Sequence, residues 1–148
     1  MTRENEIIKL SITSRKIFID VIQEMTERLL LKMGADEDET FWICLALREA
    51  IINAMKHGNK FDPSKYVHVS VSFSKGQLKI KVRDEGDGFI PEEISNPLDE
   101  ENLLKTSGRG IFYIKSFMDE VNFKKIEKVG MEIEMIKELT FVKDKKEE

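Results

Sequence analysis

The sequence predicts an α/β fold of the α+β kind, a two-layer sandwich in which helices cover one face of a mixed, mostly antiparallel sheet. Residues 66–73 and 78–84 alternate apolar and polar side chains on either side of a short turn, which is typical of an antiparallel hairpin. Residues 18–33 and 44–54 instead repeat apolar side chains at helical spacing. The predicted order, β-α-α-β-β-loop-α-β-β, favours helices packed on one sheet face.

The first half of the chain is expected to supply one strand and two helices. Residues 6–12 (EIIKLSI) read as a strand, and Ser14 is expected to cap the first helix. Asp36–Glu39 place carboxylates in the first turn of a second helix, where they interact favourably with the helix dipole. This helix is expected to run to about Lys56, with Gly58 as its C′ residue.

The second half begins with the hairpin and continues into a long irregular segment. Residues 85–108 are rich in glycine, proline, asparagine, serine and acidic residues. Such a stretch inside a compact domain is usually functional and is often a lid. A helix is expected near residues 110–118, followed by strands near residues 120–125 and 131–139.

Composition limits the classes of function. The 148 residues, 41% hydrophobic and 35% charged, predict one domain over residues 1–148, with a core at about 5–139 and a charged tail at 143–148. One cysteine and two histidines argue against a disulfide framework and a multi-histidine metal centre. The net charge of −4 argues against direct nucleic-acid binding. With no apolar run of membrane-spanning length and no signal peptide, we expect a cytoplasmic protein with no membrane partner.

A polar stripe on the second helix is the first candidate site. Glu49, Asn53 and His57 are each four residues apart, so they share one helix face. An ionised glutamate can accept a proton, and an asparagine oxygen suits Mg²⁺. Taken alone, such a stripe is more often an ordinary solvated helix face.

The second candidate lies where the strand at 78–84 ends, in the segment DEGDG. Asp84 can accept a hydrogen bond there from an exocyclic amino group. Gly86 and Gly88 lack Cβ atoms, which lets the backbone approach a flat ligand closely. The alternative interpretation is an ordinary acidic turn.

The third candidate, Ser107-Gly108-Arg109-Gly110, directly precedes the apolar helix IFYIKSFM. Glycines that open a helix expose N–H groups that bind phosphate, and the helix dipole adds to this attraction. Lys105 and Arg109 add positive charge. By itself, the pattern also fits a flexible hinge.

The order of the three candidates carries more information than any one of them. The segments LREAIINAMKHGNK (47–60), VRDEGDGF (82–89) and SGRGIFYIKSFMDEV (107–121) resemble the GHKL ATPase superfamily. Within it they resemble the anti-sigma-factor serine/threonine kinases of the RsbW and SpoIIAB kind. The resemblance covers about residues 5–139 and implies a Bergerat-type ATP-binding fold. The P-loop and protein-kinase signatures are absent from the sequence.

The resemblance implies a role for each matching residue. Asn53 would ligate the Mg²⁺ that bridges the ATP phosphates, and Glu49 would be the catalytic base for the attacking hydroxyl. Asp84 would accept a hydrogen bond from the adenine amino group, with Gly86 and Gly88 shaping the purine pocket. Residues near the lid would bind the phosphates: Lys105, Ser107, Gly108, Arg109 and Gly110.

Two departures from the family pattern concern the γ-phosphate. The last strand of the family commonly begins with Gly-Thr, whereas Met131 and Glu132 follow Gly130 here. Glu132 would repel ATP if it pointed inward. The lid of the family also has an arginine where this chain has Lys105-Thr106.

The sequence also predicts whether four side chains outside the three candidate sites are buried or exposed. Phe41 and Trp42, at the start of the second helix, are expected to pack in the core, with exposure of one of them as the alternative. Cys44 is expected to face the core and to be inert. His68 is expected to be exposed on the polar face of its strand.

The resemblance implies an anti-sigma factor that uses ATP and Mg²⁺ to phosphorylate a STAS-domain anti-anti-sigma protein. The unmodified antagonist would release a sequestered sigma factor, and phosphorylation would break the antagonist complex. The resemblance also implies a homodimer formed away from the nucleotide. Two alternatives are a non-catalytic ATP-dependent switch that sequesters a partner, and the catalytic domain of a histidine kinase, which the segment INAMKHGN also resembles.

Overall fold

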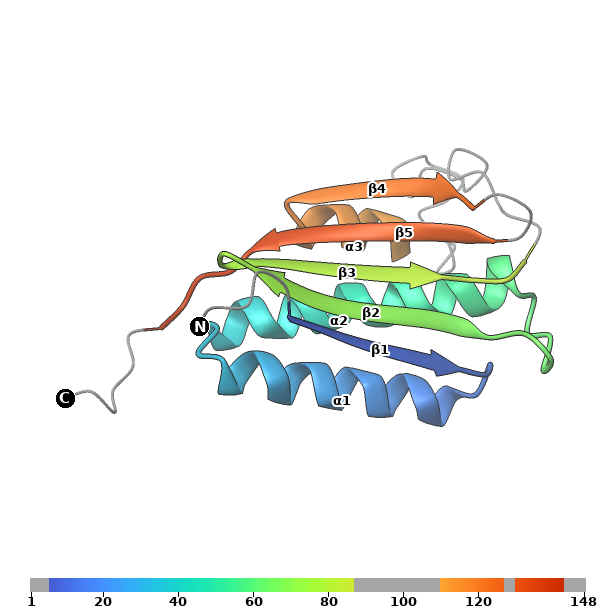
Figure 1. Ribbon diagram of the computed structural model, residues 1–148, viewed down its shortest axis with the longest axis horizontal. Coiled ribbons are helices and arrows are strands. Elements are labelled where there is room, and N and C mark those ends of the chain that lie inside the picture. The colour runs from blue at the N-terminus through green and yellow to red at the C-terminus, as the bar shows by residue number, and fades with distance from the viewer. Residues whose placement is uncertain (1–5, 87–109, 127–129, 143–148) are drawn as a thin grey trace, which may run out of the picture.

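The computed structural model describes residues 6–86, 110–126 and 130–142. The described elements follow the expected order (Figure 1). A π-helical turn, η1, is added after the second helix. Within these ranges no helix is long and apolar enough to cross a membrane. The elements are β1 (Glu6–Ile12), α1 (Lys16–Lys32), α2 (Glu37–Asn53), η1 (Ala54–Gly58), β2 (Val67–Ser74), β3 (Gln77–Arg83), α3 (Gly110–Phe117), β4 (Glu120–Lys125) and β5 (Met131–Glu138).

The five strands form one sheet in the order β1-β2-β3-β5-β4. All four neighbouring pairs are antiparallel, so the expectation of a mixed sheet is wrong for the described strands. The two helices between β1 and β2 explain why these two strands pair in antiparallel orientation. The chain runs back along α1 and forward again along α2, so β2 starts beside the end of β1 (Figure 1), where Val67 pairs with Ile12.

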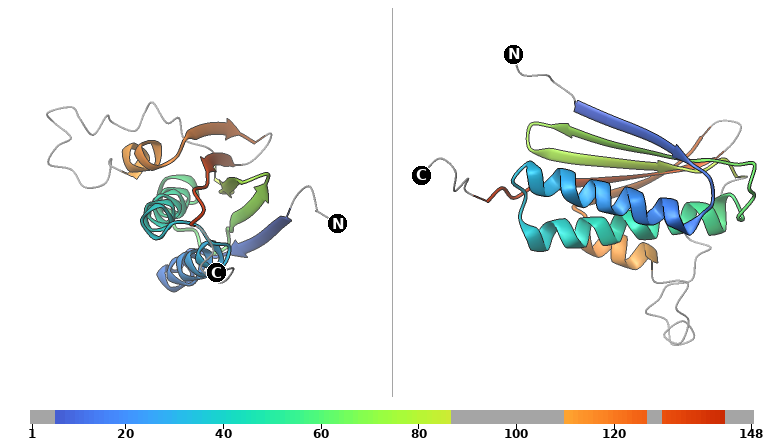
Figure 2. Two further views of the ribbon diagram at one scale, coloured as in Figure 1. Left: turned by 90° about the vertical axis from the view of Figure 1, so that its left-hand side faces the viewer. Right: turned by 90° about the horizontal axis from the view of Figure 1, so that it is seen from below.

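All three helices lie on one face of the sheet, as expected (Figure 2). Helix α2 packs against both α1 and α3, which places it over the middle of the sheet. Its apolar side chains Ile43, Leu47 and Ile51 are fully buried. Alternate strand residues complete this core from the sheet: Val67, Val69, Val71, Leu78, Ile80, Val82, Ile133 and Met135.

The opposite face of the sheet is polar and charged. Ser70 pairs with Lys81, and Lys81 pairs with Glu134 across β2, β3 and β5. Glu132 lines a groove on this face together with Arg83. The side chain of Glu132 therefore lies on the face of the sheet opposite the helices.

Two expected helix ends differ from the structure. Ser14 does not cap α1, because the chain turns tightly at this point and Arg15 occupies the N-cap position without a side-chain hydrogen bond. Gly58 is not a left-handed C′ residue. Helix α2 gives way to η1 at Ala54, and the left-handed residues are Lys60 (φ 52°) and Phe61 (φ 57°).

The expected core positions of Phe41 and Trp42 are wrong. The buried stripe of α2 begins with Thr40, Ile43 and Cys44, so the helical repeat turns the two aromatic residues outward. Phe41 is 60% exposed and Trp42 is 43% exposed.

The predicted burial of Cys44 is confirmed, and the predicted exposure of His68 is wrong. Cys44 is buried as expected, and burial raises the pKa of its thiol to about 12, which keeps it protonated and inert. His68 is half-buried rather than exposed, because it lies between Ser11 and Glu85 and contacts both.

Candidate functional site

The polar stripe of α2 faces the start of α3. A Cβ atom added to Gly110 would lie 2.8 Å from Oε2 of Glu49 and 3.2 Å from Nδ2 of Asn53. The first residue of α3 therefore closely approaches both side chains. Asn53 is buried, at 8% exposure, although its amide is polar. The polar stripe therefore meets Gly110, the described residue of the third candidate, at the N-terminus of α3, where backbone N–H groups and the helix dipole favour an anion.

Glu49 is half-buried beside this helix start. Burial raises the pKa of its carboxyl group, and the charge of Arg48 opposes that rise. Arg48 is held on the other side of α2, where its Nη1 donates to Oδ1 of Asp20 at 2.8 Å and to Oε1 of Gln23 at 3.1 Å. A carboxylate with a raised pKa, and without a direct cation partner among the described residues, is suited to accept a proton.

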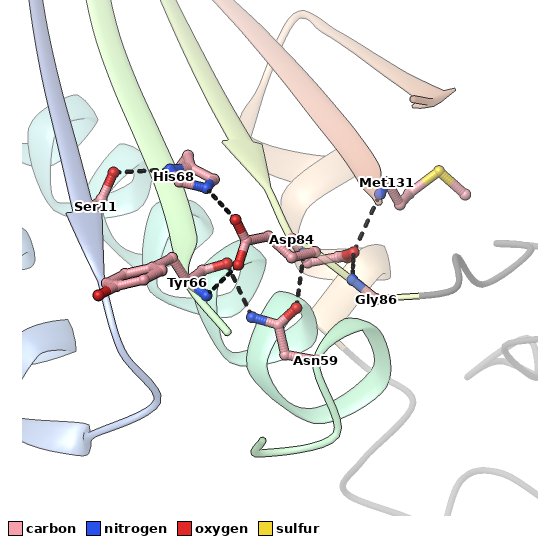
Figure 3. Close-up of polar contacts among 8 residues, drawn as sticks. Ser11, Asn59, Tyr66, His68, Asp84, Gly86 and Met131 are labelled. Atoms are coloured by element: carbon pink, nitrogen blue, oxygen red, sulfur yellow. Dashed lines mark hydrogen bonds and ion pairs between the residues drawn. The ribbon is translucent and has the colours of Figure 1, made fainter. Parts of the chain in front are cut away.

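Asp84 is a buried carboxylate at the end of β3. It is 1% exposed, and its Oδ1 accepts hydrogen bonds from the backbone N–H groups of Gly86 (3.0 Å) and Met131 (3.1 Å) (Figure 3). Burial raises the pKa of this carboxyl group, and the two backbone donors oppose the rise. They also fix its orientation.

Two glycines allow the segment around Asp84 to reach the end of α2. A Cβ atom at Gly58 would overlap the carboxylate of Asp84, and a Cβ atom at Gly86 would overlap the carbonyl oxygen of Gly58. Gly86 was expected to let the backbone approach a flat ligand closely, and in the structure the atoms that approach it belong to the backbone of Gly58. Gly58 also allows a close approach, in its case by the Asp84 carboxylate. Its φ is not positive, so η1 requires a glycine here for space and not for backbone conformation.

One small cavity connects the first and second candidates. Its volume is about 10 Å³, which is room for roughly one water molecule. A purine base in this position would therefore require lining side chains such as Met131 and Phe123 to move apart. The lining residues come from α2, η1 and the sheet: Ala50, Asn53, Ala54, Val82, Asp84, Phe123, Met131 and Ile133.

The donor set for a metal ion is small. Among the described residues, no group of three or more histidine, cysteine, aspartate or glutamate side chains could hold a metal. Mg²⁺ in nucleotide sites is commonly held by one or two protein ligands together with phosphate oxygens and water. Asn53 fits this limited role, since its amide lies beside the N-terminus of α3, where phosphates would bind.

The structure thus brings together Glu49, Asn53 and Gly110, and it joins Asn53 to Asp84 through the cavity. The remaining predicted residues lie outside the described ranges: Gly88, Lys105, Ser107, Gly108 and Arg109.

The sequence did not predict the hydrogen bonds that hold the backbone beside Asp84. Asn59 contacts the backbone next to Asp84, and Glu85 is bonded to His68 and to the backbone of Tyr66. The position of Asn59, a polar residue directly after the glycine that ends a helix, was a weak sign that its side chain makes a structural hydrogen bond. Nothing local in the sequence indicates its partner, which lies 26 residues further along the chain.

Comparisons with known proteins identify related sequences. A family model described as the histidine kinase-like ATPase domain matches residues 13–137. The anti-sigma F factor of Anoxybacillus flavithermus is 37% identical over 105 residues, covering 70% of this chain and 72% of that protein. The serine-protein kinase RsbW of Staphylococcus aureus is 28% identical over 144 residues, covering 93% of this chain and 89% of that kinase.

Solved structures show the same fold. The structure of the RsbU and RsbW domains of a Mycobacterium tuberculosis protein gives a TM-score of 0.64 at 20% identity, covering 93% of this chain and 35% of that one. The SiaB–SiaC complex of Pseudomonas aeruginosa also gives a TM-score of 0.64, at 12% identity, covering 87% of this chain and 88% of the matched chain. These structural likenesses show the fold alone. The family match and the 37% identical relative together show that this chain belongs to the histidine kinase-like ATPase domain family.

Proposed function

We propose that this chain is an ATP-dependent protein-serine/threonine kinase that acts as an anti-sigma factor. The observation that carries the proposal is the meeting of Glu49, Asn53 and the N-terminus of α3, next to a cavity that contains Asp84. The similarity to an anti-sigma F factor and to a serine-protein kinase supports the same activity.

Each residue has a defined task in this proposal. Asp84 would accept a hydrogen bond from the adenine amino group, and Asn53 would hold Mg²⁺ through its side-chain oxygen. The N–H groups at the start of α3 hold phosphate. Bound Mg-ATP would supply the γ-phosphoryl group. The hydroxyl oxygen of the partner forms the new bond to phosphorus, the bond from the γ-phosphorus to the bridging oxygen breaks so that ADP leaves, and Glu49 takes the hydroxyl proton. The raised pKa of Glu49 makes it a stronger base than an ordinary carboxylate.

The partners follow from the similarity rather than from the geometry. We propose that the phosphorylated partner is a STAS-domain anti-anti-sigma protein and that the sequestered partner is a sigma factor. A phosphate adds charge and strong acceptor oxygens, which would disrupt a closely packed complex with the antagonist. We also propose that the chain forms a homodimer through surfaces away from the nucleotide.

A labelling assay tests this proposal. The chain is incubated with ATP carrying a radiolabel on the γ-phosphate and with candidate STAS proteins, and the stability of the label to acid is then measured. Acid-stable label on the partner would support serine or threonine phosphorylation. Acid-labile label would indicate histidine chemistry, and the absence of label together with ATP-dependent binding of a partner would indicate a non-catalytic switch.

Asp84→Asn is expected to weaken ATP binding. The carboxylate is buried and fixed by two backbone donors, and the substitution replaces an acceptor oxygen with an NH₂ group. A mispaired buried polar group costs ~1–3 kcal/mol, or roughly tenfold to over a hundredfold in affinity. Calorimetric titration of both proteins with ATP measures this change, and unchanged affinity would remove Asp84 from the adenine site.

Asn53→Ala is expected to abolish the dependence of nucleotide affinity on Mg²⁺ while leaving the fold intact. The removed amide lies beside Gly110 and makes no contribution to the apolar core. Titrations with ATP in the presence of Mg²⁺ or of a chelator measure the effect. Asn122→Ala, on the exposed surface of β4, is the matched control. An Asn53→Ala protein that binds Mg-ATP like the wild type would show that Asn53 is not a metal ligand.

A further inference from the structure

Asn59 lies at the point where the chain leaves η1, and it is almost completely buried, at 1% exposure. Its backbone N–H donates to the carbonyl of Ala54 at 2.8 Å, and its carbonyl accepts from the N–H of Asp62 at 3.0 Å. The backbone of Asn59 is thus fixed to the end of the helical segment that carries Asn53.

The side chain of Asn59 makes two more hydrogen bonds, both to backbone (Figure 3). Its Oδ1 accepts from the N–H of Glu85 at 2.7 Å, and its Nδ2 donates to the carbonyl of Tyr66 at 3.0 Å. A buried amide with both side-chain polar atoms paired has one orientation and little freedom to leave it.

The bond to Glu85 acts on Asp84 through the peptide unit that joins the two residues. This unit is planar, so holding the N–H of Glu85 restricts rotation on the C-terminal side of Asp84. The N-terminal side is held by a second bond, in which the N–H of Asp84 donates to the carbonyl of Met131 at 3.0 Å. The backbone of Asp84 is therefore held by β5 on one side and by Asn59 on the other.

The carboxylate of Glu85 strengthens the same attachment. Its Oε1 accepts from the N–H of Tyr66 at 2.7 Å, and its Oε2 lies 2.9 Å from Nε2 of His68. Nδ1 of His68 lies in turn 2.7 Å from Oγ of Ser11 on β1. These contacts hold Glu85 against the sheet, and Asn59 joins the N–H of Glu85 to the helical layer.

We propose that Asn59 is a positioning residue for adenine recognition, which holds the peptide unit after Asp84 so that the carboxylate is presented to the exocyclic amino group of the base. This inference deepens the proposed function and rests on it. Asn59 itself does not touch the nucleotide. Its loss should therefore change the preference for the amino group of adenine and leave the binding of the phosphates largely intact.

The test compares ATP with ITP, whose base carries an oxygen where adenine carries the amino group. Calorimetric affinities for both nucleotides are measured for the wild type, Asn59→Ala, Asp84→Asn, the double variant and the control Asn122→Ala. Asn59→Ala should lower the preference for ATP by roughly tenfold, the effect of one lost buried hydrogen bond, with little change in ITP affinity. The double variant should lose no more preference than Asp84→Asn alone, because Asn59 acts through Asp84.

A purely structural role for Asn59 would lower the affinities for both nucleotides together and leave their ratio unchanged. A folded Asn59→Ala that keeps the wild-type ratio, or a double variant that loses further preference, would overturn the inference. Equal binding of ATP and ITP by the wild type would overturn the adenine assignment of Asp84 itself, and with it the role of Asn59.

A second variant serves if Asn59→Ala does not fold. Asn59→Asp, measured at a pH where its carboxyl group is protonated, keeps the volume of the side chain and adds no buried charge. One oxygen accepts from the Glu85 N–H, and the O–H takes the place of the donor to the Tyr66 carbonyl. Its preference for ATP should stay within about threefold of the wild type, less than the effect of one lost buried hydrogen bond. A tenfold loss in this folded variant would show that the acceptor oxygen is not what positions Asp84.

Discussion

Glu49→Gln is expected to slow phosphoryl transfer to the partner by about 10²–10⁴-fold, the usual contribution of a general base. The substitution keeps the shape and hydrogen bonding of the side chain but removes its basicity. Affinity for ATP should be equal or slightly higher, because an anion beside the phosphates is lost. Transfer rates and calorimetric affinities are measured together, with Glu24→Gln on the exposed surface of α1 as the matched control.

The dependence of the rate on pH gives a second readout for Glu49. Its folded-state pKa is raised by burial, so the base becomes protonated at a higher pH than an ordinary glutamate as the solution is acidified. The wild-type rate should therefore begin to fall above the usual titration range of glutamate, and Glu49→Gln should lack this decline. A fully active Glu49→Gln protein would show that Glu49 is not the base.

Gly58→Ala is expected to damage both the fold and the nucleotide site. The new Cβ atom would overlap the carboxylate of Asp84, so either the helical segment or Asp84 must move. Overpacking of this kind costs about 1–3 kcal/mol of the free energy of unfolding. Displacement of Asp84 should also weaken ATP binding by at least roughly tenfold, since its buried hydrogen bond to adenine is lost.

Gly34→Ala separates these two effects. Gly34 has a φ of +91° and no atom within 4 Å of an added Cβ, so alanine is strained there without a clash. Thermal unfolding should show a loss of stability in both variants, whereas calorimetry should show weaker ATP binding only in Gly58→Ala. Normal ATP affinity in a folded Gly58→Ala protein would mean that the contact with Asp84 does not matter for binding.

The elements predicted best from the sequence are those set by local patterns. Strand β1 and strand β4 have the expected bounds, and the alternating strands β2 and β3 are each shifted by one residue from the expected 66–73 and 78–84. The acidic start of α2 is also local, and Asp36 caps this helix by accepting from the N–H of Glu39 at 3.0 Å.

The features that could not be predicted depend on residues far apart in the chain. Gly58 fits a helix C′ position by its place in the sequence, but the reason for the glycine is a carboxylate 26 positions later, at Asp84. The pairing of Asn59 with the backbone of Glu85 spans the same distance. Phe41 and Trp42 were misplaced for a different reason, since their exposure depends on which stripe of α2 faces the sheet.

The candidate site was predictable in part. Glu49 and Asn53 share a helix face by their spacing alone, but the approach of Gly110 to both requires the packing of α3 against α2. The direction of Glu132 likewise follows from the register of β5, which places Met131 toward the helices and Glu132 on the opposite face. Neither fact is contained in a local pattern.

The most direct test of the account is a crystal structure of the chain with Mg²⁺ and a non-hydrolysable ATP analogue. The account predicts that the adenine amino group lies within hydrogen-bond distance of the Asp84 carboxylate and that Mg²⁺ lies about 2.0–2.1 Å from Oδ1 of Asn53. It also predicts phosphate oxygens at the N-terminus of α3, beside Glu49. A nucleotide bound elsewhere, or one whose base does not contact Asp84, would contradict the account.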